Sequence, residues 1–172
     1  MSIAYTGGGT PISHSGNKSV VIYTAANADA AKYSSHANNL EHLQGVAQRL
    51  SLDDSKKYKL QFFYYRPNLV WGTTDVAANI NHAEKIVVGI VSSTEANVNT
   101  DYTYEEVITL EKTEGWKEYN ITFDLPDIIQ KNPGKSFEKC AIFFNIVPEI
   151  DSAQKTLKTL VNLDDISLTE TK

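Results

Sequence analysis

The chain has 172 residues, of which 41% are hydrophobic and 22% charged, and its formal net charge is −5 at pH 7. This length and composition predict one globular domain with a core of its own. The acidic balance argues against nucleic acid and anionic membranes as partners, and no apolar stretch reaches the roughly 18 residues of a membrane-spanning helix.

The single cysteine, Cys140, excludes an internal disulfide but leaves the compartment open. Residues 1–15 lack the basic start and the apolar stretch of a signal peptide. We therefore expect either a cytosolic protein or a mature or excised domain whose export signal lay elsewhere. Residues 1–172 are expected to form a single β-sandwich domain, excised from or part of a larger protein.

Eight segments are rich in β-branched and aromatic residues, which predicts a strand in each. In chain order they are 18–24, 45–52, 57–66, 85–93, 104–111, 116–125, 139–147 and 160–168. The DDSKK sequence at 53–57 predicts a hairpin turn, and the alanine-rich 24–43 segment predicts at most a short helix. Residues 127–135 and 148–156 predict loops or single helical turns. With so little helix to connect parallel strands, the fold class is all-β: an antiparallel two-sheet β-sandwich.

Alternation along the strands assigns their two faces. In 57–66 the natural core row is Tyr58, Leu60, Phe62 and Tyr64, and the opposite row is Lys59, Gln61, Phe63 and Tyr65. In 139–147 the core row is Cys140, Ile142, Phe144 and Ile146, and the opposite row is Ala141, Phe143, Asn145 and Val147. Both second rows therefore place aromatic rings on the face turned away from the core.

These second rows suit a carbohydrate ligand. Gln61, Phe63 and Tyr65 stand beside Phe143 and Asn145 if the two strands belong to one sheet. Aromatic rings stack on the apolar C–H faces of sugars, while side-chain amides donate to and accept from hydroxyls. The alternative is that these rings are covered by a loop such as 24–43 or by a neighbouring domain.

We expect different roles for the two tryptophans. Trp116 begins a strand just after Gly115, which favours packing in the core or at a sheet edge. Trp71 lies in RPNLVWGTTD, a polar segment that leaves the aromatic strand. A loop tryptophan offers a large, rigid contact area, so Trp71 is either a ligand contact or a loop-packing residue.

Four blocks occur in a recognisable order: HSGNKSVVIY (14–23), GVAQRLSLDDSKKYKLQFFYYR (45–66), EGWKEYNITFDLP (114–126) and VNLDDISL (161–168). Over about 14–168 the chain resembles the carbohydrate-binding modules of the jelly-roll, galactose-binding-like class found attached to glycoside hydrolases. The resemblance implies a non-catalytic glycan-binding module, with binding on a concave sheet or at edge loops, and an extracellular or cell-surface location. The candidate carbohydrate-binding residues are Gln61, Phe63, Tyr65, Arg66, Trp71, Phe143 and Asn145.

The resemblance also implies a structural calcium ion, for which Asp164 is the candidate ligand. Asp164 shares parity with Ile166 and Leu168, which predicts that it points inward, where a carboxylate needs a cation or hydrogen-bond donors. The family's N-terminal acidic ligand has no counterpart in SIAYTGGGT (2–10). The alternatives are that Asp164 is a buried acid satisfied by other donors, or that Asp165 is a solvated turn residue.

No catalytic motif occurs, and the four histidines (His14, His36, His42 and His82) lie in polar segments without metal-like spacing. The leading prediction is therefore binding of an oligo- or polysaccharide without catalysis, next to a linked catalytic or adhesin domain. The alternative function is a structural or protein-interaction sandwich of an adhesin, a phage tail or a multidomain enzyme. In that case a protein partner covers the outer rings, because interfaces favour tyrosine and tryptophan.

Overall fold

The computed structural model describes residues 13–16, 19–24, 45–66, 80–82, 84–92, 103–112, 115–147 and 158–171. Within these ranges the chain forms nine strands and one short helix. They are β1 (Val20–Thr24), β2 (Gly45–Leu50), β3 (Lys57–Tyr65), β4 (Ile80–His82), β5 (Lys85–Ser92), β6 (Tyr104–Thr109), β7 (Lys117–Asp124), α1 (Leu125–Lys131), β8 (Cys140–Val147) and β9 (Lys158–Thr171). Among the described residues, no helix has the length and apolar character needed to cross a membrane.

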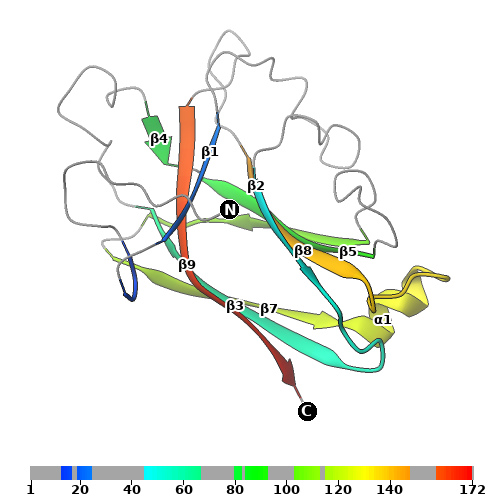
Figure 1. Ribbon diagram of the computed structural model, residues 1–172. Helices are drawn as coiled ribbons and strands as arrows, with labels where there is room; N and C mark the ends of the chain where they lie inside the picture. The colour runs from blue at the N-terminus through cyan, green and yellow to red at the C-terminus, as the bar shows by residue number, and fades with distance from the viewer. Residues whose placement is uncertain are drawn as a thin grey trace, which may run out of the picture.

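The strands form two sheets that pack face to face (Figure 1). The five-stranded sheet has the order β1-β9-β3-β7, with β4 also paired to β9, and the four-stranded sheet has the order β2-β8-β5-β6. The pairs are antiparallel except for β4 with β9, which is parallel. The prediction of an all-β, two-sheet sandwich is confirmed. All eight predicted strands are present, and the three-residue β4 is an addition to them.

The turn at 53–57 forms, but it does not connect a hairpin. The Lys56 N–H donates to the Asp53 carbonyl at 3.0 Å, and an Asp53 carboxylate oxygen accepts from the Ser55 N–H at 2.9 Å. β2 nevertheless pairs with β8 and β3 pairs with β7 and β9, so this turn carries the chain from one sheet to the other. Leu52 is buried just before the turn. The hairpin prediction was wrong because the same turn chemistry serves a crossover between layers.

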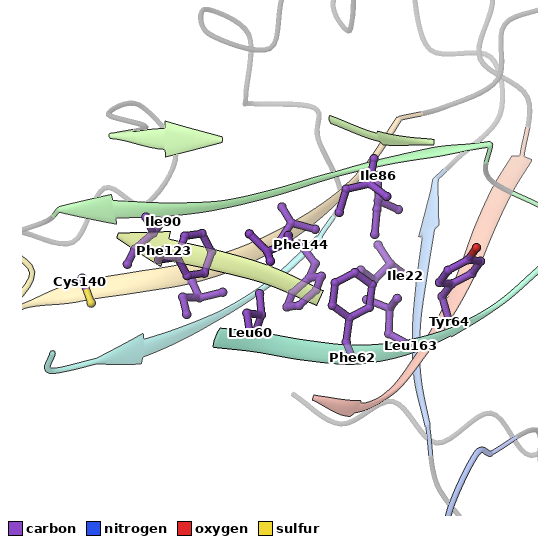
Figure 2. Close-up of a cluster of buried hydrophobic side chains, with 14 of the residues drawn as sticks. Ile22, Leu60, Phe62, Tyr64, Ile86, Ile90, Phe123, Cys140, Phe144 and Leu163 are labelled. Atoms are coloured by element: carbon purple, nitrogen blue, oxygen red, sulfur yellow. The ribbon is translucent and has the colours of Figure 1, made fainter. Parts of the chain in front are cut away.

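The hydrophobic core lies between the two sheets and contains the predicted inward rows. Figure 2 shows Leu60 and Phe62 of β3 in the same layer of side chains as Phe144 of β8 and Ile86 and Ile90 of β5. Phe62 meets Phe144 edge to face, with ring centroids 5.1 Å apart. The alternation of β3 is therefore the pattern of a strand with one buried face, as the burial of every second residue from Leu60 to Tyr64 confirms.

A β-bulge interrupts the pairing of β9 with β3. Gln61 faces Ser167, but Phe63 faces Asp164, so β9 has one residue more than β3 between these two pairs. Asp165 takes up the extra length with a φ of 46°, in the left-handed region that aspartate tolerates better than most residues. Because one added residue reverses the side-chain alternation, parity counted back from Leu168 does not hold at Asp164.

The only thiol of the chain is buried in this core, and we predict that it is unreactive in the native protein. Cys140 is 4% exposed, and burial, assisted by the charge of Asp54, raises the pKa of its thiol to about 11. At pH 8 we expect an aromatic disulfide reagent to label native Cys140 at least about a hundredfold more slowly than the urea-unfolded chain, since the thiolate is the nucleophile. Equal rates in the two states would contradict the buried position.

Candidate functional site

The outer face of the five-stranded sheet carries the second row of β3. Gln61, Phe63 and Tyr65 are each partly exposed and lie on the side of the sheet away from the core. Between them lie the buried residues Phe62 and Tyr64, which point inward. The alternation therefore places these three residues where the sequence predicts them, next to solvent.

Four aromatic rings gather on this face: His14, Phe63, Tyr65 and Trp116, together called the outer aromatic cluster. His14 stacks on Phe63 with ring centroids 3.7 Å apart and an interplanar angle of 13°. Trp116 lies edge-on to His14 at 6.1 Å and is tilted by 31° against Tyr65 at 5.6 Å. The side chain of His14 is 33% exposed, and the other three residues are partly exposed. The cluster is thus an apolar surface of several rings that solvent still reaches.

Three segments contribute these rings: β3, the residue before β7, and the segment around His14. Phe63 and Tyr65 come from β3, and Trp116 immediately precedes β7, whose Lys117 pairs with Tyr64 of β3. Trp116 shares parity with Glu118, which is exposed, so its side chain belongs to the outer face. Trp116 was expected to pack in the core or at a sheet edge. It lies outside the core, next to the edge strand β7.

The His14 segment is attached to the bulge of β9 by its two aspartates. One carboxylate oxygen of Asp164 accepts the backbone N–H groups of His14 and Ser15, at 2.7 and 3.3 Å. Asp165 pairs one carboxylate oxygen with His14 Nδ1 and accepts the Ser15 hydroxyl with the other, both at 2.6 Å. The hydrogen bonds from Ser15 and His14 lower the pKa of Asp165 below its usual value, so this carboxylate is ionised at neutral pH.

A polar row adjoins the cluster on the same face. Gln61 lies between Asn120 of β7 and Ser167 of β9, and both neighbours are exposed. The Asn120 amide donates to Glu118 at 2.8 Å. Amide and hydroxyl groups beside partly exposed rings combine hydrogen bonding with apolar contact on one surface.

The other half of the predicted surface lies elsewhere. Phe143 and Asn145 belong to β8 in the four-stranded sheet, so their outer face is on the opposite side of the sandwich from Phe63. Phe143 is also only 3% exposed, and its ring lies over Gly89 of the neighbouring strand. The prediction that the two rows adjoin was wrong because β3 and β8 are in different sheets. The exposed position expected for Phe143 is also contradicted.

Arg66 is part of the scaffold rather than of an exposed surface. It is 7% exposed, and its guanidinium donates to the Leu110 carbonyl at 2.9 Å and to Glu84 at 3.2 Å. Leu110 and Glu84 flank β6 and β5, so Arg66 connects the end of β3 to the other sheet. Because it is buried in this way, Arg66 is not among the exposed residues of the outer sheet face. Trp71 lies outside the described residues, as does all but Thr24 of the 24–43 segment named as a cover for the rings.

The surroundings of Asp164 do not fit a calcium ion. Asp164 lies opposite Phe63 on the outer face instead of pointing inward, because the bulge reverses its parity. Backbone N–H groups of His14, Ser15 and Asp165 donate to its two oxygens, and such donors present positive charge where a cation would bind. No group of three or more His, Cys, Asp or Glu side chains is placed to hold a metal in the described part of the chain. Of the alternative, a buried acid satisfied by donors, the donors are present, but Asp164 is only partly buried.

Sequence reasoning missed two members of the cluster. Trp116 was within reach, since counting back from the outward residues Asn120 and Glu118 places it on the same face. His14 was not, because its position depends on hydrogen bonds to Asp164 and Asp165, which are 150 residues away along the chain. No periodicity near residue 14 encodes such a long-range contact.

No protein-family model matches the chain, and no curated protein matches it. Solved structures with a similar fold include a CBM4 module, 15% identical, with the match covering 80% of this chain and 67% of that one at a TM-score of 0.49. A CBM61 module in complex with β-1,4-galactotriose is 12% identical over 94% and 77% of the two chains, also at 0.49. The enzymatically active domain of tailspike protein 4 of bacteriophage CBA120 is 10% identical over 99% and 18%, again at 0.49. Carbohydrate-binding modules are therefore among its structural neighbours, at low identity.

Proposed function

We propose that this domain is a non-catalytic glycan-binding module whose ligand lies on the outer face of the five-stranded sheet. The observation that carries the proposal is the outer aromatic cluster, in which four rings from three segments of the chain meet on one solvent-exposed surface. Gln61 and Asn120 next to it supply both donors and acceptors for hydroxyl groups. Ring faces and amides together match the alternation of apolar and polar surface on a sugar.

The location of this surface differs from the one that the sequence predicts. It retains Gln61, Phe63 and Tyr65 and adds His14 and Trp116. A shallow, open sheet face binds through few contacts and many waters, so dissociation constants between about 1 µM and 1 mM are expected. A module of this kind increases the local concentration of a linked catalytic or adhesin domain at a polysaccharide. An extracellular or cell-surface location of a larger parent protein belongs to the same proposal.

Trp116→Ala tests the surface directly. If a stacked sugar covers roughly 60 Å² of the ring, the burial is worth about 1.5 kcal/mol at about 25 cal/mol per Å², or about tenfold in affinity. A glycan array that includes soluble glucans, galactans and xylans identifies the ligand, and isothermal titration then compares the affinities of the variant and the unchanged protein. We expect Trp116→Ala to bind at least about tenfold more weakly.

Val107→Ala is the matched control, because Val107 is 46% exposed on the outer face of the other sheet. It removes exposed apolar surface without touching the cluster, and its affinity should equal that of the unchanged protein. Failure to bind any glycan on the array would contradict the function. If Val107→Ala lost binding while Trp116→Ala bound normally, the site would instead lie on the four-stranded sheet.

A further inference from the structure

We propose that Asp165 is a positioning residue for the His14 ring. It holds the ring so that Nε2 can accept a hydrogen bond from an uncharged saccharide. This inference rests on the proposed function for its ligand. It concerns a separate observation: the most exposed ring of the outer aromatic cluster is held by a β-bulge rather than by a strand of its own.

Three contacts determine the place of the imidazole. Phe63 covers one face of the ring at 3.7 Å, Asp165 engages Nδ1 at 2.6 Å, and Asp164 accepts the backbone N–H of the same residue at 2.7 Å. Trp116 is in edge contact with the same ring, at 6.1 Å between centroids. The ring is therefore fixed at one face, at Nδ1 and at its backbone while a third of its side chain stays exposed, so it lacks the freedom of an ordinary surface side chain.

Asp165 also selects the tautomer of the ring. Its carboxylate is ionised at neutral pH and can only accept, so in the uncharged imidazole the proton is on Nδ1 and the lone pair is on Nε2. The left-handed backbone of Asp165 is what aims the carboxylate back at residues 14 and 15. Few side chains tolerate this φ, and asparagine is one of them.

The acceptor at Nε2 and the charges around it restrict the ligand. A sugar hydroxyl donates to the Nε2 lone pair, whereas a uronate carboxylate or a sulfate has no proton to give. Asp164 and Glu118 pair with Phe63 on this sheet face, and Asp165 at the bulge contacts His14, so three carboxylates add negative charge around the ring. Uncharged saccharides are therefore favoured over anionic ones.

The first test needs no ligand and separates this inference from the proposed function. Long-range ¹H–¹⁵N NMR spectra at pH 8 should show His14 protonated at Nδ1 in the unchanged protein. Asp165→Asn, whose amide oxygen still accepts from Nδ1 and whose backbone tolerates the same φ, should retain this tautomer. Asp165→Ala should lose it and give the Nε2-protonated form that dominates in solvated histidine side chains. An Nε2-protonated His14 in the unchanged protein, or an Nδ1-protonated one in Asp165→Ala, would overturn the positioning role whatever the glycan array shows.

The second test measures binding of the neutral glycan with the highest affinity on the array. Asp165→Ala should weaken it about tenfold, as expected for a lost charge-assisted hydrogen bond, and Asp165→Asn by no more than about threefold. His14→Phe keeps a flat ring over Phe63 but removes Nε2, and should weaken binding about fivefold. Unchanged affinity in both Asp165→Ala and His14→Phe, or an array dominated by uronates and sulfated glycans, would refute the inference. If no glycan on the array bound but the NMR spectra gave the expected tautomers, the glycan function would be refuted. The positioning of His14 by Asp165 would still be supported.

Discussion

Phe62→Ala is expected to lower the free energy of unfolding by about 3–5 kcal/mol, the cost of truncating a fully buried phenylalanine. Phe62 has no exposed surface and joins three strands: its ring lies edge to face with Phe144 of the opposite sheet and stacks on Tyr119 of β7 at 5.6 Å. The cavity left by the ring would lie in the middle of the interface between the sheets, where backbone pairing on both sides prevents collapse. Since domains of this size are stable by about 5–15 kcal/mol, the loss is a large part of the total.

Urea unfolding of Phe62→Ala and Phe63→Ala side by side provides the measurement and its control. The two residues are adjacent, but Phe63 is partly exposed on the outer face and contacts His14 rather than the core. We expect Phe63→Ala to cost about 1 kcal/mol, and both variants to keep the urea dependence of the unchanged protein. Equal losses in the two variants would mean that the two faces of β3 are not buried differently.

The strands and their faces could be predicted because alternation is a local signal. In β3 burial alternates from Leu60 to Tyr64, and the predicted inward rows of both β3 and β8 lie between the sheets. The requirement to bury one face is a property of each strand by itself. It therefore appears in the sequence without knowledge of the neighbours.

The division of strands between sheets could not be predicted in the same way. The outer rows of β3 and β8 look alike in sequence, and only pairing across long sequence separations places them on opposite sides of the sandwich. The aspartate that begins the turn at 53–57 forms the same hydrogen bonds in a hairpin and in a crossover between sheets. This ambiguity misplaced two of the seven candidate carbohydrate-binding residues, Phe143 and Asn145.

Single residues account for the remaining differences between the sequence-based predictions and the structure. The bulge at Asp165 reverses the parity of Asp164 and turns a predicted inward ligand into an acceptor of backbone N–H groups. The same bulge brings His14 onto Phe63, so the interruption that turned Asp164 outward also assembled the aromatic cluster. Arg66 ends the aromatic strand, and its burial depends on a carbonyl and a carboxylate of the other sheet.

Gly89→Ala is expected to destabilise the four-stranded sheet by about 1–3 kcal/mol, even though alanine is normally the better residue inside a strand. A Cβ atom at this position would lie 2.4 Å from the ring of Phe143 and 2.5 Å from the backbone carbonyl oxygen of Tyr104. The ring has some freedom to move. The carbonyl belongs to the strand paired with β5, where Ile90 faces Tyr104, so it moves only at the expense of that pairing.

Gly115→Ala is the matched control, since nothing lies within 4 Å of its added Cβ and its φ is not in the left-handed region. Its stability should stay within about 0.5 kcal/mol of the unchanged protein or rise slightly, because the unfolded chain loses freedom. The double variant Gly89→Ala with Phe143→Ala removes the first of the two clashes and leaves the second. Truncating the buried Phe143 ring is itself destabilising, so the double variant is compared with Phe143→Ala alone. If the carbonyl of Tyr104 is the rigid obstacle, Gly89→Ala should cost about as much in the Phe143→Ala background as in the unchanged protein. If Gly89→Ala costs nothing in that background, Phe143 is the sole reason for glycine at this position.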